Sequence, residues 1–115
     1  MLEEYTEFTI ECFEEIRRAI VLAKEAYQFG NCERARELGN DGYTAAFAQY
    51  KLNIIMRNYF LERFKSETRE DVKKELKGIV DFHSREVVIS REMIKTFEGL
   101  DELITQEING QETGE

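Results

Sequence analysis

Apolar residues recur along the chain at the three- and four-residue steps of an α-helix. In residues 2–29 these positions include Cys12 and Ile16, and similar stripes follow in residues 31–64 and 69–97. Apolar residues at this spacing lie on one face of a helix, which they bury against a neighbour. The pattern therefore predicts three long helices.

Short breaks separate these segments. Gly30 suits the end of the first helix because glycine adopts a positive φ easily, and Asn31 suits the cap of the next helix because its side chain accepts backbone N–H bonds. Thr68 followed by Asp71 resembles a capping box. These residues predict tight connections at both breaks.

Gly99 interrupts the third stripe, and we expect a short amphipathic helix over residues 100–108 to follow it. Tight connections make sequential helices antiparallel neighbours. The predicted fold is therefore all-α, a bundle of three long antiparallel helices plus a short C-terminal helix. Residues 1–109 are predicted to form a single domain, and residues 110–115 a flexible polar tail.

The second segment is apolar on two faces. One face carries small residues such as Gly39 and Gly42, which favour the close approach of another helix, with a local kink as the alternative. Three helices leave the opposite, aromatic face uncovered, and such a patch exceeds what a monomer normally exposes. We therefore expect a homodimer or a higher homo-oligomer. The predicted interface residues are Tyr43, Phe47, Tyr50 and Ile54.

The chain has 16 Lys and Arg against 24 Asp and Glu, a formal net charge of −8. Such a chain repels phosphate backbones, so no nucleic-acid partner is expected. No membrane association is expected either, because no segment is long and apolar enough to span a bilayer.

The two cysteines are predicted to be free thiols. In the predicted helices Cys12 and Cys32 are roughly 20 Å or more apart along the axis. A disulfide requires a much shorter Cα separation. Free thiols are typical of a reducing compartment, so a cytoplasmic location is expected.

Acidic residues at three- and four-residue spacing share a face in each of the first two helices. Two such groups facing each other would offer the oxygen ligands that Mg²⁺ prefers, and the metal could activate water for attack on a phosphoanhydride. A solvated acidic face explains the same pattern without a ligand. The candidate metal ligands are Glu11, Glu14, Glu37 and Asp41, with Glu15 and Asn40 as alternatives.

The run Glu11-x-x-Glu14-Glu15, followed after a spacer by Glu37-Leu38-Gly39-Asn40-Asp41, resembles the motifs of the MazG-like all-α nucleoside triphosphate pyrophosphohydrolases. This resemblance implies a helical dimer whose carboxylates bind Mg²⁺ and split a nucleotide into monophosphate and pyrophosphate, or a degenerate relative of such an enzyme. The chain departs from the family pattern at Arg18 and Asn40, where the family has acidic residues.

Helix geometry adds a condition to this hypothesis. If the first hairpin turns at Gly30, Glu14 lies beside the region of Ala46, well past Glu37. The two acidic motifs are then offset by roughly 13 Å at helical rise. A partner chain or an irregular turn would have to bring them together.

His83, the only histidine, lies on the apolar stripe of the third helix, either as a buried base or as a hydrogen-bonded core residue. The run 42–48, Gly-Tyr-Thr-Ala-Ala-Phe-Ala, resembles the HEPN helical bundles, which act as RNases or scaffolds. Their arginine ahead of the histidine is missing, since Lys77 is the residue six before His83. The alternative to an enzyme is thus a non-catalytic helical dimerisation or interaction module, with a HEPN-like scaffold as one form.

Overall fold

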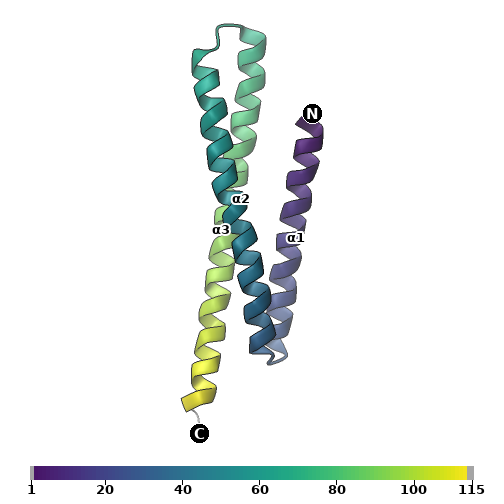
Figure 1. The fold of residues 1–115 in the computed structure, drawn as a ribbon, viewed down its shortest axis with the longest axis vertical. Helices are drawn as coiled ribbons and strands as arrows, with labels where there is room; N and C mark the ends of the chain where they lie inside the picture. The colour runs from purple at the N-terminus through teal and green to yellow at the C-terminus, as the bar shows by residue number, and fades with distance from the viewer. Residues whose placement is uncertain (1, 114–115) are drawn as a thin grey trace. The chain divides into compact units, whose positions relative to one another are not determined.

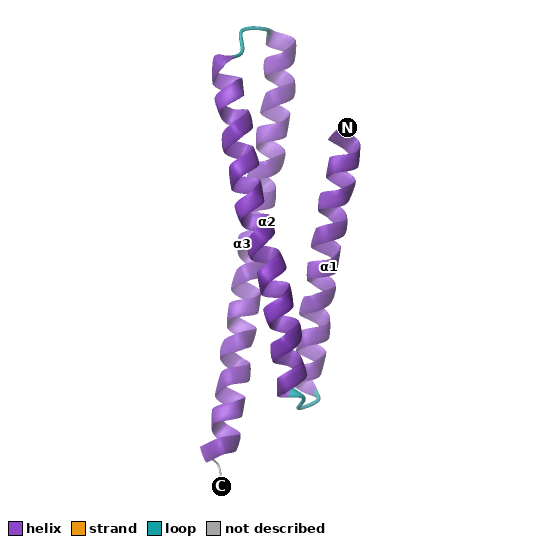
Figure 2. Cartoon of the chain, viewed as in Figure 1, coloured by secondary structure: helices purple, strands orange, loops and turns teal. Residues whose placement is uncertain are grey.

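The computed structural model describes the backbone of residues 2–113 and the side chains of residues 9–111. It contains three α-helices joined by two short turns, and no strand occurs in this part of the chain (Figures 1 and 2). The helices are α1 (Leu2–Gln28), α2 (Cys32–Ser66) and α3 (Glu70–Thr113). This confirms the prediction of an all-α protein with three long helices.

The prediction of a separate short C-terminal helix is wrong, because α3 continues through Gly99 to Thr113. A glycine inside a helix costs only about 1 kcal/mol relative to alanine. Here the cost is offset by burial on both sides, since Phe97, Leu100 and Ile104 are at most 6% exposed. The predicted polar tail is therefore helical from residue 110 to Thr113, and residues 114–115 lie outside the described part.

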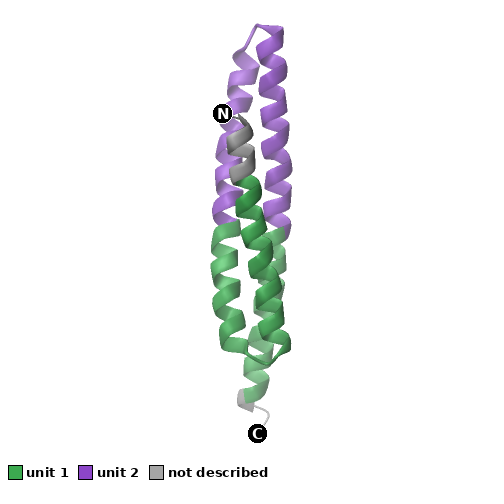
Figure 3. Cartoon of the chain, turned by 90° about the vertical axis from the view of Figure 1, so that its right-hand side faces the viewer, with its two compact units in different colours: residues 1–46, 93–115 green, residues 47–92 purple. Residues whose placement is uncertain are grey.

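The chain divides into two compact units (Figure 3). Unit 1 comprises residues 1–46 and 93–115, which are α1, the first part of α2 and the last part of α3. Unit 2 comprises residues 47–92, a hairpin made by the rest of α2 and α3. The sequence gives no sign of this division, because both boundaries fall inside continuous helices.

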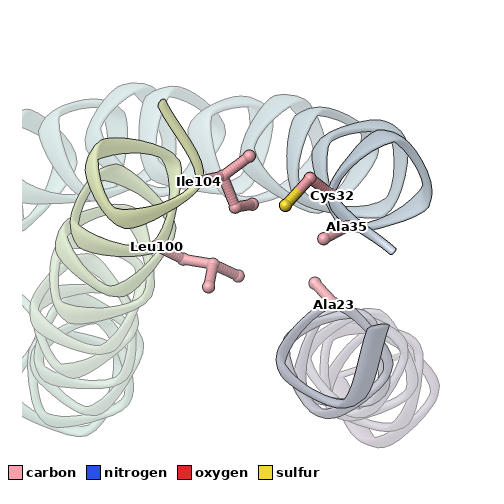
Figure 4. Packing of buried hydrophobic residues seen from close by; sticks show 5 residues of the cluster. All are labelled: Ala23, Cys32, Ala35, Leu100 and Ile104. Atoms are coloured by element: carbon pink, nitrogen blue, oxygen red, sulfur yellow. The ribbon is translucent and has the colours of Figure 1, made fainter. Parts of the chain in front are cut away.

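The core of unit 1 combines small side chains from two helices with large ones from the third (Figure 4). Ala23 of α1 and Ala35 of α2 are fully buried, while α3 contributes Leu100 and Ile104. Cys32 completes the cluster as a free thiol, and Cys12 is free as well, which confirms the absence of a disulfide.

Gly42 lies where α2 meets both other helices of unit 1. A Cβ atom built on Gly42 would overlap Cζ and Cε1 of Phe97 and would lie 3.1 Å from the Cβ of Ala19. A Cβ built on Gly39 would meet nothing within 4 Å. The predicted close approach of helices is therefore confirmed at Gly42 and does not occur at Gly39.

The first turn has the hydrogen bonds of a Schellman motif. Gly30 has a φ of +80°, its N–H donates to the Tyr27 carbonyl at 3.1 Å, and the Asn31 N–H donates to the Ala26 carbonyl at 2.8 Å. The Asn31 Oδ1 then accepts the Arg34 N–H at 3.1 Å. These bonds confirm the predicted roles of Gly30 and Asn31.

The second turn is organised by Glu67. Its carboxylate accepts the backbone N–H groups of Thr68 and Arg69 at 3.2 and 3.0 Å, and the Arg69 guanidinium at 3.0 Å. The bonds from Arg69, more than the one from Thr68, lower the pKa of Glu67 to about 2. The carbonyl of Arg69 accepts the Lys73 N–H at 2.9 Å, so α3 begins one residue later than the predicted capping box implies.

Candidate functional site

The predicted metal ligands all belong to unit 1, and all of their side chains are exposed. Among the residues whose side chains are described, no group of three or more His, Cys, Asp or Glu residues could hold a metal ion. In this part of the single chain, the two acidic motifs therefore do not form a metal-binding cluster. The exposed candidates are Glu11, Glu14 and Glu15 on α1 and Glu37, Asn40 and Asp41 on α2.

Two of these carboxylates lie near the thiol of Cys12. Burial raises the pKa of the Cys12 thiol, and the negative charges of Glu15 and Glu11 raise it further. A thiol with a raised pKa stays protonated and is a poor nucleophile. On α2, Glu37 instead accepts a hydrogen bond from Arg34 at 3.1 Å, in a pair that is more than half exposed.

Unit 1 also contains a pocket of about 250 Å³ between α2 and α3. Its apolar lining includes Phe97, and its polar lining includes Arg36 and Asp101, so charges of both signs border it. Of the metal ligands and interface residues predicted from the sequence, only Asn40 and Tyr43 line this pocket. The spacing of apolar residues in the sequence could not predict this pocket. Its lining on α3 lies on both sides of Gly99, where the sequence predicted a break in the helix.

In unit 2, a buried hydrogen bond links the two hairpin helices. His83 and Asn53 are each 1% exposed, and the His83 Nδ1 lies 2.8 Å from the Asn53 Oδ1. The Asn53 Nδ2 donates to the Gln49 carbonyl at 2.8 Å, which orients the amide so that its oxygen accepts from histidine. The proton of the neutral imidazole is therefore assigned to Nδ1.

Aromatic rings enclose His83. Its ring stacks on Phe60 with centroids 6.1 Å apart and an interplanar angle of 6°, and Phe82 meets it edge-on at 5.3 Å. Burial lowers the pKa of His83 because the charged imidazolium would lose its hydration. The structure thus makes His83 a hydrogen-bonded core residue, one of the two interpretations of the sequence. Asn53 was missed, although its three- and four-residue spacing from Phe60 through Met56 signals a position on the same face.

The predicted interface residues are partly covered within a single chain. Tyr43, Tyr50 and Ile54 are half-buried, and Phe47 is 37% exposed. The Phe47 ring lies 6.3 Å from that of Tyr50, and the ammonium of Lys51 lies 4.7 Å from the Phe47 centroid. Packing within the chain therefore covers much of the aromatic face that the sequence predicted as the interface.

A different face of α2 exposes its apolar side chains more fully. Leu52, Ile55 and Tyr59 are 41%, 63% and 55% exposed, and Ala48 on the same face is also exposed. These four residues are spaced by four, three and four positions, so they form one stripe along the helix. We call this stripe the α2 seam; its members are Ala48, Leu52, Ile55 and Tyr59.

Within the described residues, no helix has the length and apolar character needed to cross a membrane.

Comparison with known proteins does not test the family resemblance, which therefore stays a prediction. The MazG-like resemblance still rests on the acidic runs around Glu11 and Glu37. Searches of protein-family models, of curated proteins and of solved structures give no match to this chain.

Proposed function

We propose that this protein is a non-catalytic helical assembly module that acts as a homodimer through α2. The observation that carries the proposal is the exposure of the α2 seam, whose three large apolar side chains are 41–63% exposed. Burying such a stripe against another helix releases water from apolar surface, at roughly 25 cal/mol per Å². A contiguous exposed apolar stripe is a recognised mark of a protein interface.

The architecture of unit 2 supports this proposal. A hairpin of two helices covers one face of each helix, and that face is already occupied by the buried pair Asn53 and His83. The α2 seam lies away from this buried face. A partner helix is what such an uncovered face requires.

The substitution Ile55→Asp tests the proposal. Sedimentation equilibrium should show a dimer for the unchanged protein, and Ile55→Asp should raise the dissociation constant at least about tenfold, because a carboxylate would be desolvated in an apolar interface. Circular dichroism should show unchanged helix content. Val21→Asp is the matched control, since Val21 on α1 is 53% exposed and should not affect association.

Two results would contradict the assembly proposal. One is an unchanged protein that sediments as a monomer at every concentration studied. The other is equal weakening by Val21→Asp and Ile55→Asp, which would show that added negative charge, rather than the α2 seam, determines association.

The pyrophosphohydrolase hypothesis remains a second proposal. It is favoured by the exposure of Glu11, Glu14, Glu37 and Asp41, which leaves these carboxylates accessible to a nucleotide-bound metal or to a partner chain. If the protein is only an assembly module, its melting temperature should not change when millimolar Mg²⁺ and a nucleoside triphosphate are added. No pyrophosphate should be released from the nucleotide. A rise in melting temperature that Glu37→Ala abolishes would instead support the enzyme, because only binding to the folded state raises it.

A further inference from the structure

We infer that two copies of the chain pair in antiparallel orientation along the α2 seam, about a two-fold axis between residues 53 and 54. This inference rests on the proposed function and adds to it the direction, the register and the facing residues of the partner. Three observations on α2 carry it: the spacing of the exposed residues, their sizes and the charges at the ends of the stripe.

The spacing is that of a coiled coil. From the α2 seam, a three-residue step backward reaches Ala45 and a three-residue step forward reaches Glu62, and both residues are exposed. Alternating steps of three and four average 3.5 residues, the repeat that keeps one face of a helix against a partner over several turns. Because α2 is continuous from Cys32 to Ser66, the whole stripe lies on a single helix.

The sizes of the side chains favour antiparallel pairing. In that orientation Leu52 faces the partner's Ile55, and Ala48 faces the partner's Tyr59. Each contact at the ends then combines a small with a large side chain, so the distance between the helices stays even and the interface fills without voids. Parallel pairing would set alanine on alanine at one end and tyrosine on tyrosine at the other.

The charges favour the same orientation. Parallel pairing would place Glu62 beside the partner's Glu62, and like charges at facing positions are destabilising. Antiparallel pairing places Glu62 against the partner's Ala45. It also brings Asp41, one further step along the stripe, close to the partner's Lys65, so that opposite charges meet at both ends.

Cysteine cross-linking tests the orientation. In a Cys12→Ser, Cys32→Ala background, Ala48→Cys and Tyr59→Cys are made as separate proteins, mixed in equal amounts, allowed to exchange subunits and oxidised mildly. Antiparallel pairing predicts a mixed disulfide between the two proteins, identified by mass. Each protein oxidised alone should give at least tenfold less covalent dimer, because its two cysteines would lie about 16 Å apart along the helices, beyond disulfide reach. Leu52→Cys mixed with Ile55→Cys provides a second facing pair.

The outcomes separate this inference from the proposed function. A self-linked Ala48→Cys dimer without the mixed product would show parallel pairing and overturn the inference, while the assembly module would stand. A protein that sediments as a dimer but gives no disulfide from either pair would overturn the antiparallel register, while weaker association of Ile55→Asp in the same protein would leave the assembly proposal standing. A monomer in sedimentation would overturn both.

Discussion

Replacing Gly42 by alanine is expected to lower the free energy of unfolding by about 2 kcal/mol, although alanine is the better helix former. The new Cβ would overlap the ring of Phe97 and press on Ala19, and overpacking of a filled core typically costs 1–3 kcal/mol. The ring cannot move freely, because Phe97 is only 2% exposed. Urea denaturation followed by circular dichroism, at one fixed protein concentration, measures the change.

Gly39 provides a matched control three residues away on the same helix. No atom lies within 4 Å of a Cβ built there, so Gly39→Ala should raise the free energy of unfolding by about 0.5–1 kcal/mol through helix propensity. Adding Phe97→Leu to Gly42→Ala should restore part of the loss by removing the overlapping ring atoms. Equal effects of the two glycine substitutions would contradict the close packing at Gly42.

Gly30 and Gly99 show what the sequence could and could not predict about helix ends. Both glycines predict a break, but only Gly30 provides one. The apolar positions Phe97, Leu100 and Ile104 keep helical spacing across Gly99, and their burial in unit 1 outweighs the local cost of glycine. The continuity of the apolar stripe therefore predicts the end of this helix better than the presence of a single glycine does.

The acidic motifs show a second limit of what the sequence can predict, which concerns contacts between helices. Spacing within a helix establishes that Glu11 shares a face with Glu14, and that Glu37 shares one with Asp41. Whether two such faces converge depends on the height at which each residue lies along its hairpin. The turn at Gly30 fixes those heights, and the described part of the single chain forms no metal-binding cluster, with every candidate side chain exposed.

The sequence does not single out one interface face on α2, because this helix is apolar on nearly every side. Phe47 and Ile54 lie on one face, Asn53 and Phe60 on a second, and Ile55 on a third. A helix with apolar residues all round gives periodicity little power to select the uncovered face. Only the tertiary packing shows that Ile55, at 63% exposure, faces water while Asn53 is buried.

The buried pair of Asn53 and His83 gives the second large expected effect. Asn53→Ala should lower the free energy of unfolding by about 2 kcal/mol, because the Nδ1–H of His83 would lose its acceptor in a site with little access to water. Asn58→Ala, at an exposed position on the same helix, should change it by less than about 0.5 kcal/mol. Replacing both Asn53 and His83 by leucine should cost less than Asn53→Ala alone, since the Nδ1–H of His83 would be removed together with its acceptor. A double variant with a lower free energy of unfolding than Asn53→Ala would contradict this account.

The same pair predicts how stability depends on pH. Burial lowers the pKa of His83 in the folded protein below its ordinary value of 6.5, so between those two pKa values the unfolded chain binds more protons than the folded one. The free energy of unfolding should therefore be fully retained above about pH 6.5 and fall as the pH drops from there toward the folded pKa, by at most about 1.4 kcal/mol per pH unit. Urea titrations at several pH values measure this slope, and His83→Leu should remove it. An unchanged slope in His83→Leu would show that other groups produce the pH dependence and that the buried imidazole does not stay neutral for the reason given.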